Sequence, residues 1–187
     1  MLETERLILR RWQDSDREPF AEMNADPRVM EFFPDCLTRE ESDQLIENIE
    51  SHFDNRGFGL FATELKAENK LVGFIGLHVA SFQAHFTPCV EIGWRIAAPY
   101  WGKGLATEGS REVIRFAFEW LRLENLVSFT VPENVPSRRL MEKLGMTHNP
   151  ADDFDHPKLL GHPLSRHVLY RFRSLPSPKA PTRARRV

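Results

Sequence analysis

Hydrophobic positions change their spacing several times along the chain, and each change marks the border of a predicted element. Residues 5–12 are rich in β-forming side chains and favour a strand. Asp14 or Ser15 can cap a short helix that runs to about Asn24, because their side-chain oxygens can accept hydrogen bonds from the first free N–H groups. The chain is therefore expected to begin with a strand followed by a helix.

A longer helix is predicted after Thr38. Thr38 and Glu41 have the spacing of a capping box, in which each side chain bonds the backbone N–H of the other residue. Gly57 can end this helix in a left-handed conformation. Apolar side chains recur on one face of the helix at Leu45, Ile46, Ile49 and Phe53.

Three strands are expected next, at 58–65, 71–79 and 89–97, and the loop at 66–70 is a plausible hairpin connection. A helix follows, because small and apolar residues return with helical spacing. These residues are Ala106, Ser110, Val113, Ala117 and Leu121.

The last third of the chain predicts a strand at 127–131, a short helix at 137–144 and a final strand at 167–172. Pro136 suits the first turn of the short helix, and Gly145 suits its end. Strands and helices in this order are consistent with a mixed sheet flanked by helices, an α/β (α+β) fold.

Length and composition are ordinary for a globular domain: 187 residues, of which 41% are hydrophobic and 28% charged, with a net charge of −2. We expect one domain over 1–173 and a flexible, basic, proline-containing tail over 174–187. Cys36 and Cys89 do not form a disulfide framework. No transmembrane run or signal peptide is visible, so a cytoplasmic protein without a membrane partner is expected.

The turn after the predicted strand at 89–97 carries the clearest chemical signal, because Gly102 and Gly104 precede a helix there. Glycine lets the backbone approach a ligand closely, and free N–H groups at a helix N-terminus bind phosphate oxygens. The nucleoside triphosphate pattern fails because Lys103 is followed by glycine. The dinucleotide pattern is incomplete because Thr107 replaces its last glycine. A phosphate cradle and a plain strand-to-helix turn both fit these glycines.

Three ordered segments resemble the GNAT superfamily of N-acetyltransferases. Gly104 and Ala106 match the family's coenzyme A loop, with Trp101 in place of the usual Gln or Arg. Residues 134–146 resemble the family's Asn-x-x-Ser helix, and residues 3–10 resemble the first strand of the branch of ribosomal-protein N-terminal acetyltransferases (RimJ/RimL-type). The resemblance implies an enzyme that transfers acetyl from acetyl-CoA to an amine, without a metal.

The resemblance also implies a mostly antiparallel sheet whose fourth and fifth strands splay apart to admit the cofactor. Backbone groups near Trp94, Arg95 and Ile96 would then lose their partners in the sheet and bind the pantetheine arm. Glu91 lies on the same strand and is the candidate general base, acting directly or through water. An exposed carboxylate or an ion-pair partner is the alternative interpretation of Glu91.

Asn134 and Ser137 lie where the family binds pantetheine and handles the sulfur. Many members carry a tyrosine at the position of Met141, so the resemblance implies that Ser137 stabilises the departing thiolate instead. A helix cap is the alternative role for Ser137. Cys89 is expected to be a small buried hydrophobe and not a nucleophile.

Phosphate contacts are expected from two regions. Arg139 and Lys143 are four residues apart on one helix face and could meet the 3′-phosphate of coenzyme A, or they could form a solvated basic surface. Lys103 is expected to make a weak phosphate contact, and Trp101 to lie beneath the loop. The predicted cofactor-binding residues are Trp94, Arg95, Ile96, Gly102, Lys103, Gly104, Leu105, Ala106, Thr107, Asn134, Ser137, Arg139 and Lys143.

The acceptor is less constrained. A carboxylate base suits an α-amine, with a pKa of about 8, better than a lysine. We therefore expect a ribosomal or other protein N-terminus, with a small amine (amino acid, polyamine or drug) as the alternative and a noncatalytic acyl-CoA-binding protein as a second alternative. A homodimer is compatible with the sequence, and no direct nucleic-acid contact is expected. Acidic clusters could attract a cationic amine or form only a solvated surface: Asp35, Glu40, Glu41 and Asp43, and Asp152, Asp153 and Asp155.

Overall fold

The computed structural model describes residues 1–173, so the tail predicted at 174–187 lies outside the described residues. The strands pair in the order β1-β2-β3-β4-β5-β6-β9-β7, and β8 also pairs with β9. The pair β5–β6 is parallel, and the other pairs are antiparallel. The strands are β1 Leu2–Glu3, β2 Leu7–Arg10, β3 Leu60–Leu65, β4 Lys70–Val79, β5 Val90–Ile96, β6 Asn125–Thr130, β7 Thr147–His148, β8 Phe154–Asp155 and β9 Arg166–Arg173.

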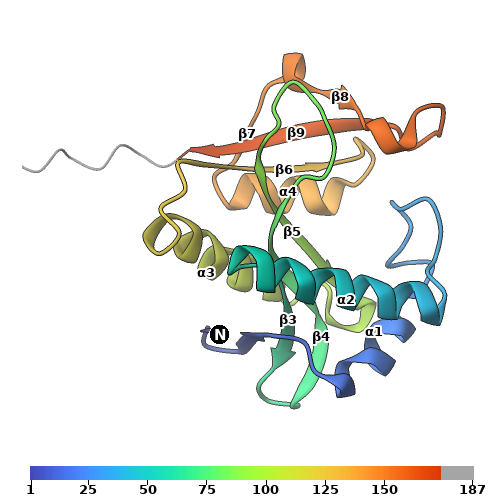
Figure 1. Ribbon diagram of the computed structural model, residues 1–187, viewed down its shortest axis with the longest axis vertical. Coiled ribbons are helices and arrows are strands. Elements are labelled where there is room, and N and C mark those ends of the chain that lie inside the picture. The colour runs from blue at the N-terminus through green and yellow to red at the C-terminus, as the bar shows by residue number, and fades with distance from the viewer. Residues whose placement is uncertain (174–187) are drawn as a thin grey trace, which may run out of the picture.

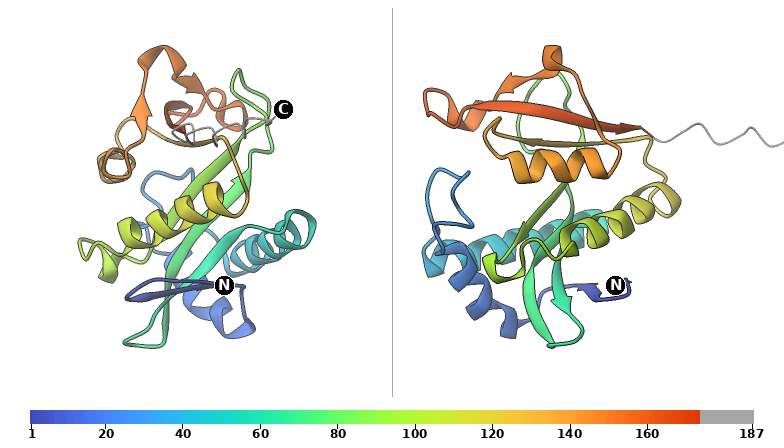
Figure 2. Two further views of the ribbon diagram at one scale, coloured as in Figure 1. Left: turned by 90° about the vertical axis from the view of Figure 1, so that its left-hand side faces the viewer. Right: turned by 180° about the vertical axis from the view of Figure 1, so that it is seen from behind.

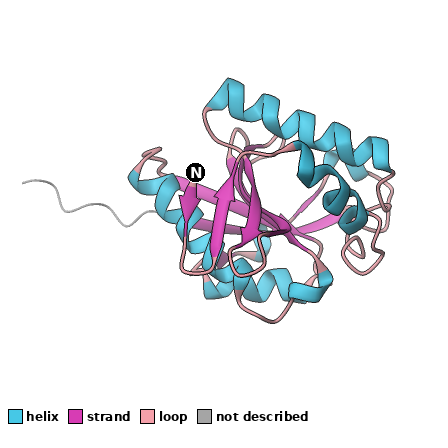
Figure 3. Cartoon of the chain, turned by 90° about the horizontal axis from the view of Figure 1, so that it is seen from below, coloured by secondary structure: helices cyan, strands magenta, loops and turns pink. Residues whose placement is uncertain are grey.

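Helices cover both faces of this sheet. Figures 1 and 2 show α1 and α2 on one face and α3 and α4 on the other, and Figure 3 shows the sheet between them. The predicted mixed, mostly antiparallel sheet flanked by helices is therefore confirmed. The helices are α1 Arg17–Asn24, α2 Arg39–Arg56, α3 Leu105–Glu119 and α4 Val135–Lys143, with 3-10 turns at Asp14–Asp16, Ala98–Tyr100, Pro150–Asp152 and Pro157–Leu159.

The predicted capping signals of α2 are confirmed. The Thr38 side chain accepts from the Glu41 N–H at 3.2 Å, and the Thr38 N–H donates to the Glu41 carboxylate at 2.8 Å. Gly57 ends the helix with a φ of 77°. In α3 the apolar stripe is buried at Val113 and Ala117, but Leu121 lies beyond the last helical residue, Glu119.

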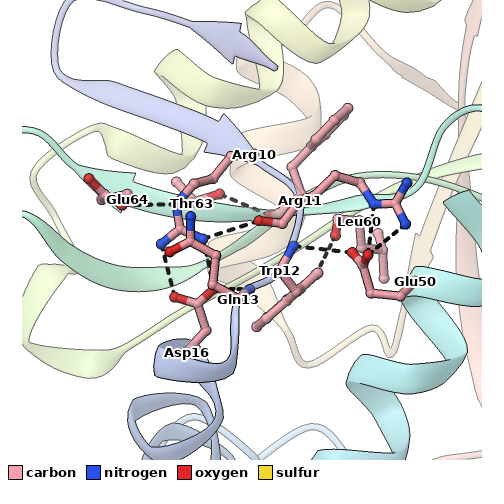
Figure 4. Close-up of polar contacts among 10 residues, drawn as sticks. Arg10, Arg11, Trp12, Gln13, Asp16, Glu50, Leu60, Thr63 and Glu64 are labelled. Atoms are coloured by element: carbon pink, nitrogen blue, oxygen red, sulfur yellow. Dashed lines mark hydrogen bonds and ion pairs between the residues drawn. The ribbon is translucent and has the colours of Figure 1, made fainter.

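The first predicted strand is too long, because residues after Arg10 leave the sheet for α2. Arg10 lies between Asp16 and Glu64, at 2.7 and 2.9 Å, and so joins β2 to α1 and β3 (Figure 4). Arg11 instead donates to Glu50 of α2 at 2.7 Å. These polar contacts end the strand and fix both helices of this face against the sheet.

The sheet opens between β5 and β6. These strands correspond to the fourth and fifth predicted strands, at 89–97 and 127–131, which the resemblance predicts to splay apart. They share one pair of residues, Glu91 with Val127, and Figure 1 shows β6 running across the upper end of β5. Aromatic side chains of the β4–β5 loop hold the closed end, where Phe82 and Phe86 pack against Phe129 of β6. Below this point no strand among residues 1–173 pairs with the inner edge of β5.

Candidate active site

The backbone of β5 divides its hydrogen-bonding groups between β4 and the opening. Hydrogen-bonded and non-bonded pairs alternate in an antiparallel ladder. Ala97 N–H donates to Val72 O on β4, and Ala80 N–H of the β4 end donates to Cys89 O. By this alternation Arg95 directs its N–H and C=O to β4, whereas Trp94 and Ile96 direct theirs to the opening.

The backbone groups of Trp94 and Ile96 therefore face the opening, whereas those of Arg95 do not. Its backbone groups pair with Phe74 of β4. The carbonyl of Ile96 already accepts a hydrogen bond from the indole N–H of Trp101 at 2.6 Å. Trp101 is 50% exposed, so the expectation that it lies beneath the loop is wrong: the hydrogen bond holds the ring over the strand end, where it meets solvent.

The glycine turn presents free N–H groups at the start of α3. Gly102 and Gly104 have φ values of 73° and 78°, and Gly104 is the N-cap without a side-chain hydrogen bond. Glu108 N–H is bonded to Gly104 O. The N–H groups of Leu105, Ala106 and Thr107 precede it and have no acceptor inside the helix. The side chain of Leu105 is buried in the core, so only its backbone is available.

A hollow of about 640 Å³ lies beside this helix end, lined by Gly104, Thr107 and Lys143 among others. It brings the predicted Lys143 of α4 next to the glycine turn. Arg111 also lines it and was not predicted, although it lies one turn after Thr107 on the same helix. Arg139 is not among the lining residues, and the Lys103 ammonium lies over the Tyr100 ring at 5.0 Å.

Arg6, in the turn between β1 and β2, and Glu108 of α3 fix the glycine turn. Arg6 donates to the Lys103 carbonyl at 2.9 Å and to the Glu108 carboxylate at 2.6 Å. The Thr4 hydroxyl donates to the same carboxylate at 2.6 Å. These contacts hold the pKa of Glu108 below its ordinary value despite partial burial. The N-terminal end of α3 is thus anchored without using its own N–H groups.

Glu91 lies opposite His78 on β4, with the imidazole Nδ1 3.4 Å from the carboxylate. The Glu91 side chain is 12% exposed. Burial raises the pKa of Glu91 well above its ordinary value. Burial, and to a lesser degree the charges of His52 and Lys158, lower the pKa of His78 to about 4. A neutral imidazole therefore faces a carboxyl group that holds its proton more tightly than usual.

Ser137 lies on the other side of β5, on α4. Its hydroxyl accepts a hydrogen bond from the Trp94 indole N–H at 3.3 Å. Asn134 caps α4 instead of Ser137: its side-chain oxygen accepts from the Ser137 N–H at 3.2 Å, and its amide donates to Thr130 at 3.0 Å. Met141 is buried in the core. The Ser137 hydroxyl therefore does not cap the helix.

Three of the predicted residues lie on two faces of β5. Glu91 and the Arg95 side chain lie on the α1–α2 face, and Ser137 lies on the α3–α4 face. Burial raises the pKa of the Cys89 thiol to about 11, which keeps it a protonated, buried side chain. His78 was missed because its position depends on the register of β4 against β5, which the sequence alone does not give.

Among residues 1–173, no three His, Cys, Asp or Glu side chains form a group that could hold a metal ion. In the same part of the chain, none of the helices has the length and apolar character that crossing a membrane requires.

Comparisons with known proteins agree with this geometry. The family "Acetyltransferase (GNAT) domain" matches residues 6–147. The chain is 29% identical over 145 residues to the uncharacterized N-acetyltransferase YnaD of Bacillus subtilis, covering 76% of this chain and 80% of that protein. It is 33% identical over 159 residues to the FsC-acetyl coenzyme A-N(2)-transacetylase of Aspergillus fumigatus, covering 79% and 65%.

Solved structures show the same fold. A GNAT-family acetyltransferase from Bacillus anthracis matches with a TM-score of 0.76 and 27% identity, over 92% of this chain and 97% of that one. The ribosomal-protein-S5-alanine acetyltransferase of Vibrio fischeri matches with 0.72 and 18%, over 91% and 94%. The spermidine N-acetyltransferase of Vibrio cholerae, solved with CoA and spermine, matches with 0.70 and 20%, over 90% and 95%. The chain therefore belongs to the GNAT family of acetyltransferases and is an N-acetyltransferase.

Proposed function

We propose that the protein transfers acetyl from acetyl-CoA directly to an amine in a ternary complex. We further propose that this amine is the α-amine of a protein or peptide N-terminus. The observation that carries this proposal is the placement of Glu91 and Ser137 on opposite faces of β5, beside the opening of the sheet. An amine can approach from the Glu91 face while a sulfur is held on the Ser137 face.

The residues present fit acetyl-CoA. Phosphate oxygens would meet the free N–H groups of Leu105, Ala106 and Thr107, with Lys143 and Arg111 nearby. Amide groups of the pantetheine arm would meet the backbone of Trp94 at the open edge of β5. When bound, acetyl-CoA supplies an acetyl thioester whose carbonyl carbon is attacked by the amine, with release of the thiol.

Glu91 and Ser137 then have separate tasks. The Glu91 carboxylate takes the proton that the amine must lose, directly or through water, and its raised pKa makes it a stronger base than an exposed glutamate. The Ser137 hydroxyl, fixed by the Trp94 indole, donates its proton in a hydrogen bond to the thiolate as negative charge develops there.

The proposed acceptor follows from proton affinities. Near pH 7, deprotonation of an α-amine costs roughly 1.4 kcal/mol, and that of a lysine roughly 4.6 kcal/mol. One carboxylate base suits the smaller cost. A small-molecule amine is the second candidate, because a cleft beside Arg95 could enclose a compact acceptor.

The test is an acetyl-CoA turnover screen of N-terminal peptides, lysine peptides and small amines, with products identified by mass. We expect N-terminal acetylation to dominate and initial-rate plots to intersect, as a ternary complex requires.

Glu91→Gln should lower turnover by about 100-fold or more while acetyl-CoA affinity is kept. Wild-type turnover should fall as the pH drops below the raised pKa of Glu91, and the Gln variant should lack this limb. Near-wild-type turnover of the variant across pH 6–9 would contradict the role of Glu91.

A further inference from the structure

A cleft of about 520 Å³ lies on the α1–α2 face, between the segment that joins these helices, the start of α2 and strand β5. The joining segment projects beside the sheet at the right of Figure 1. Within the described residues, Arg95 is the one part of the sheet that lines the cleft. Phe33 and Asp35 of the joining segment and Glu41 of α2 also line it.

Arg95 is a cation without an acidic partner among residues 1–173. Its Nη1 donates to the neutral side chain of Asn24 at 2.7 Å. Its guanidinium lies 4.2 Å from the Phe33 ring centre and 5.4 Å from that of Phe74. Its Nε is fully buried and has no hydrogen-bond partner. Burial lowers the pKa of Arg95 to about 10, so the group stays charged at neutral pH.

The buried and unpaired Arg95 guanidinium destabilises the ligand-free protein. A desolvated charge that lacks a counterion loses hydration without regaining it from an ion pair. Two aromatic rings and one amide compensate part of this cost. Arginine binds carboxylates through two parallel N–H groups, so a carboxylate entering the cleft would complete the set of contacts.

Two of the four acids at and beside the cleft already have polar partners. Asp43 pairs with Arg39 at 3.1 Å, and the Glu41 carboxylate accepts from the Thr38 N–H at 2.8 Å. In the late loop, Asp152 pairs with Arg171, Asp153 with His148, and Asp155 with Arg166. Ion pairs within the chain thus neutralise part of the acidic surface predicted to attract a cationic amine, whereas Asp35, Glu40 and Glu41 have no ion pair among the described residues.

The strand face between Arg95 and Glu91 is open. Gly93 lies between them on the same face of β5, and a Cβ on Gly93 would meet only a Leu60 methyl at 4.0 Å. The Cα atoms of Glu91 and Arg95 are about 13 Å apart, at roughly 3.3 Å per residue. Both side chains can lean over Gly93, toward an acceptor a few bonds long.

We propose that the acceptor carries a carboxylate close to its primary amine, and that Arg95 binds this carboxylate while Glu91 faces the amine. The inference rests on the proposed function and narrows its substrate class. Two sources give this chemistry: the side chain of an acidic first residue of a peptide, and the carboxylate of a free amino acid.

The test compares acceptors that differ only in this group. One pair is a C-terminally amidated peptide beginning with Glu and the same peptide beginning with Gln. The other pair is alanine and alaninamide. The peptide pair tests whether the enzyme recognises a side-chain carboxylate, and the alanine pair tests whether it recognises an α-carboxylate. In at least one pair, wild-type kcat/KM should be roughly 10- to 100-fold higher for the carboxylate member, the range of a charged hydrogen bond.

Variants then assign the preference to Arg95. Arg95→Gln should abolish the difference within the responsive pair by lowering the kcat/KM of the carboxylate member, since the charged contact is lost. Arg95→Lys keeps the charge and should retain part of the preference. Arg28→Gln is the matched control, because Arg28 is 69% exposed, pairs with Asp26 and does not line the cleft. The control should keep the full wild-type preference.

Calorimetry with the N-acetylated carboxylate member of the responsive pair gives a readout that needs no turnover. Its affinity should fall roughly 10- to 100-fold in Arg95→Gln and stay unchanged in Arg28→Gln. Equal loss for both members of a pair, or no wild-type preference in either pair, would overturn the inference. If no amine is acetylated but carboxylate binding still depends on Arg95, the proposed function fails while the assignment of Arg95 stands.

Discussion

At the scale of single residues, burial decides the protonation of the pair across β4 and β5. Glu91 and His78 face each other with restricted access to water, and burial favours the neutral form of each. The sequence could place Glu91 on a strand, but not opposite a histidine. The resulting shifts make the stability of the fold depend on pH in a direction that can be derived.

Replacing Glu91 with Gln should remove a destabilisation that grows with pH. Above the ordinary pKa of 4.5 the unfolded chain loses this proton, while the folded protein retains it up to the raised pKa. The unfolded state then binds fewer protons, so the free energy of unfolding of the wild type falls as the pH rises through this window. Gln resembles the protonated carboxyl and does not titrate.

The measurement is the melting temperature of both proteins from pH 4.5 upward. Glu91→Gln should gain stability relative to the wild type as the pH rises, and the gain should level off above the folded pKa. Glu22→Gln, at an exposed position on α1, is the control and should show no such gain. A pH-independent difference between Glu91→Gln and the wild type would show that Glu91 ionises normally in the folded protein.

Ser137→Ala should slow acetyl transfer by roughly 10- to 150-fold, the equivalent of about 1.5–3 kcal/mol for a hydrogen bond to a charged sulfur. Asn134 caps the helix, so this variant should keep its fold. Single-turnover kinetics with two acyl donors measures the effect. A donor with a more acidic thiol should depend less on Ser137. Equal defects with both donors would instead indicate a positional role, and Trp94→Phe, which removes the indole donor, would then reproduce them.

At the scale of elements, the start of α3 combines a helix end with two left-handed glycines. A Cβ added at Gly104 would meet only Arg6 Nη2, at 3.6 Å, so the fold itself leaves space there. The requirement for glycine comes from its positive φ and from the space that a ligand would need. These two causes can be separated by comparison with another glycine.

Gly104→Ala should weaken acetyl-CoA binding, whereas Gly57→Ala should not. Gly57 has a φ of 77° and no atom within 4 Å of its virtual Cβ, so both variants carry the same backbone strain. Each should lose about 1 kcal/mol of stability. Calorimetry should find reduced affinity in Gly104→Ala alone. Unchanged affinity in a folded Gly104→Ala protein would remove the phosphate site from this turn.

Local signals explain which elements could be predicted. The capping box of α2, the apolar stripe of α3 and the glycine turn act over a few residues, and the structure contains all three. The end of β2 depends on contacts of Arg11 with α2, and the two-residue strands β7 and β8 exist only through pairing with β9. Strand ends and cross-strand pairs such as Glu91–His78 depend on tertiary contacts, which hydrophobic periodicity does not encode.

At the scale of the whole molecule, the sheet consists of two parts joined at one end. Strands β1–β5 form one part, and β6–β9 form the other. They meet at the pair Glu91–Val127 and at the aromatic cluster above it. A ligand in the opening would contact both parts. The open edge of β5 should therefore change more on cofactor binding than the edge that pairs with β4.

Amide hydrogen exchange measured by NMR can test this at neighbouring residues. Trp94 N–H faces the opening, and Arg95 N–H pairs with β4. Without ligand, Trp94 should exchange faster than Arg95, because its amide lacks a partner in the sheet. Saturating acetyl-CoA should slow the hydrogen exchange of the Trp94 amide and of the amides of 105–107. This slowing should exceed the general effect of ligand-linked stability, which is about 2.7 kcal/mol at 100 times Kd. Arg95 should show only that general effect. Equal protection of Trp94 and Arg95 would mean that the cofactor stabilises the fold without entering the opening of the sheet.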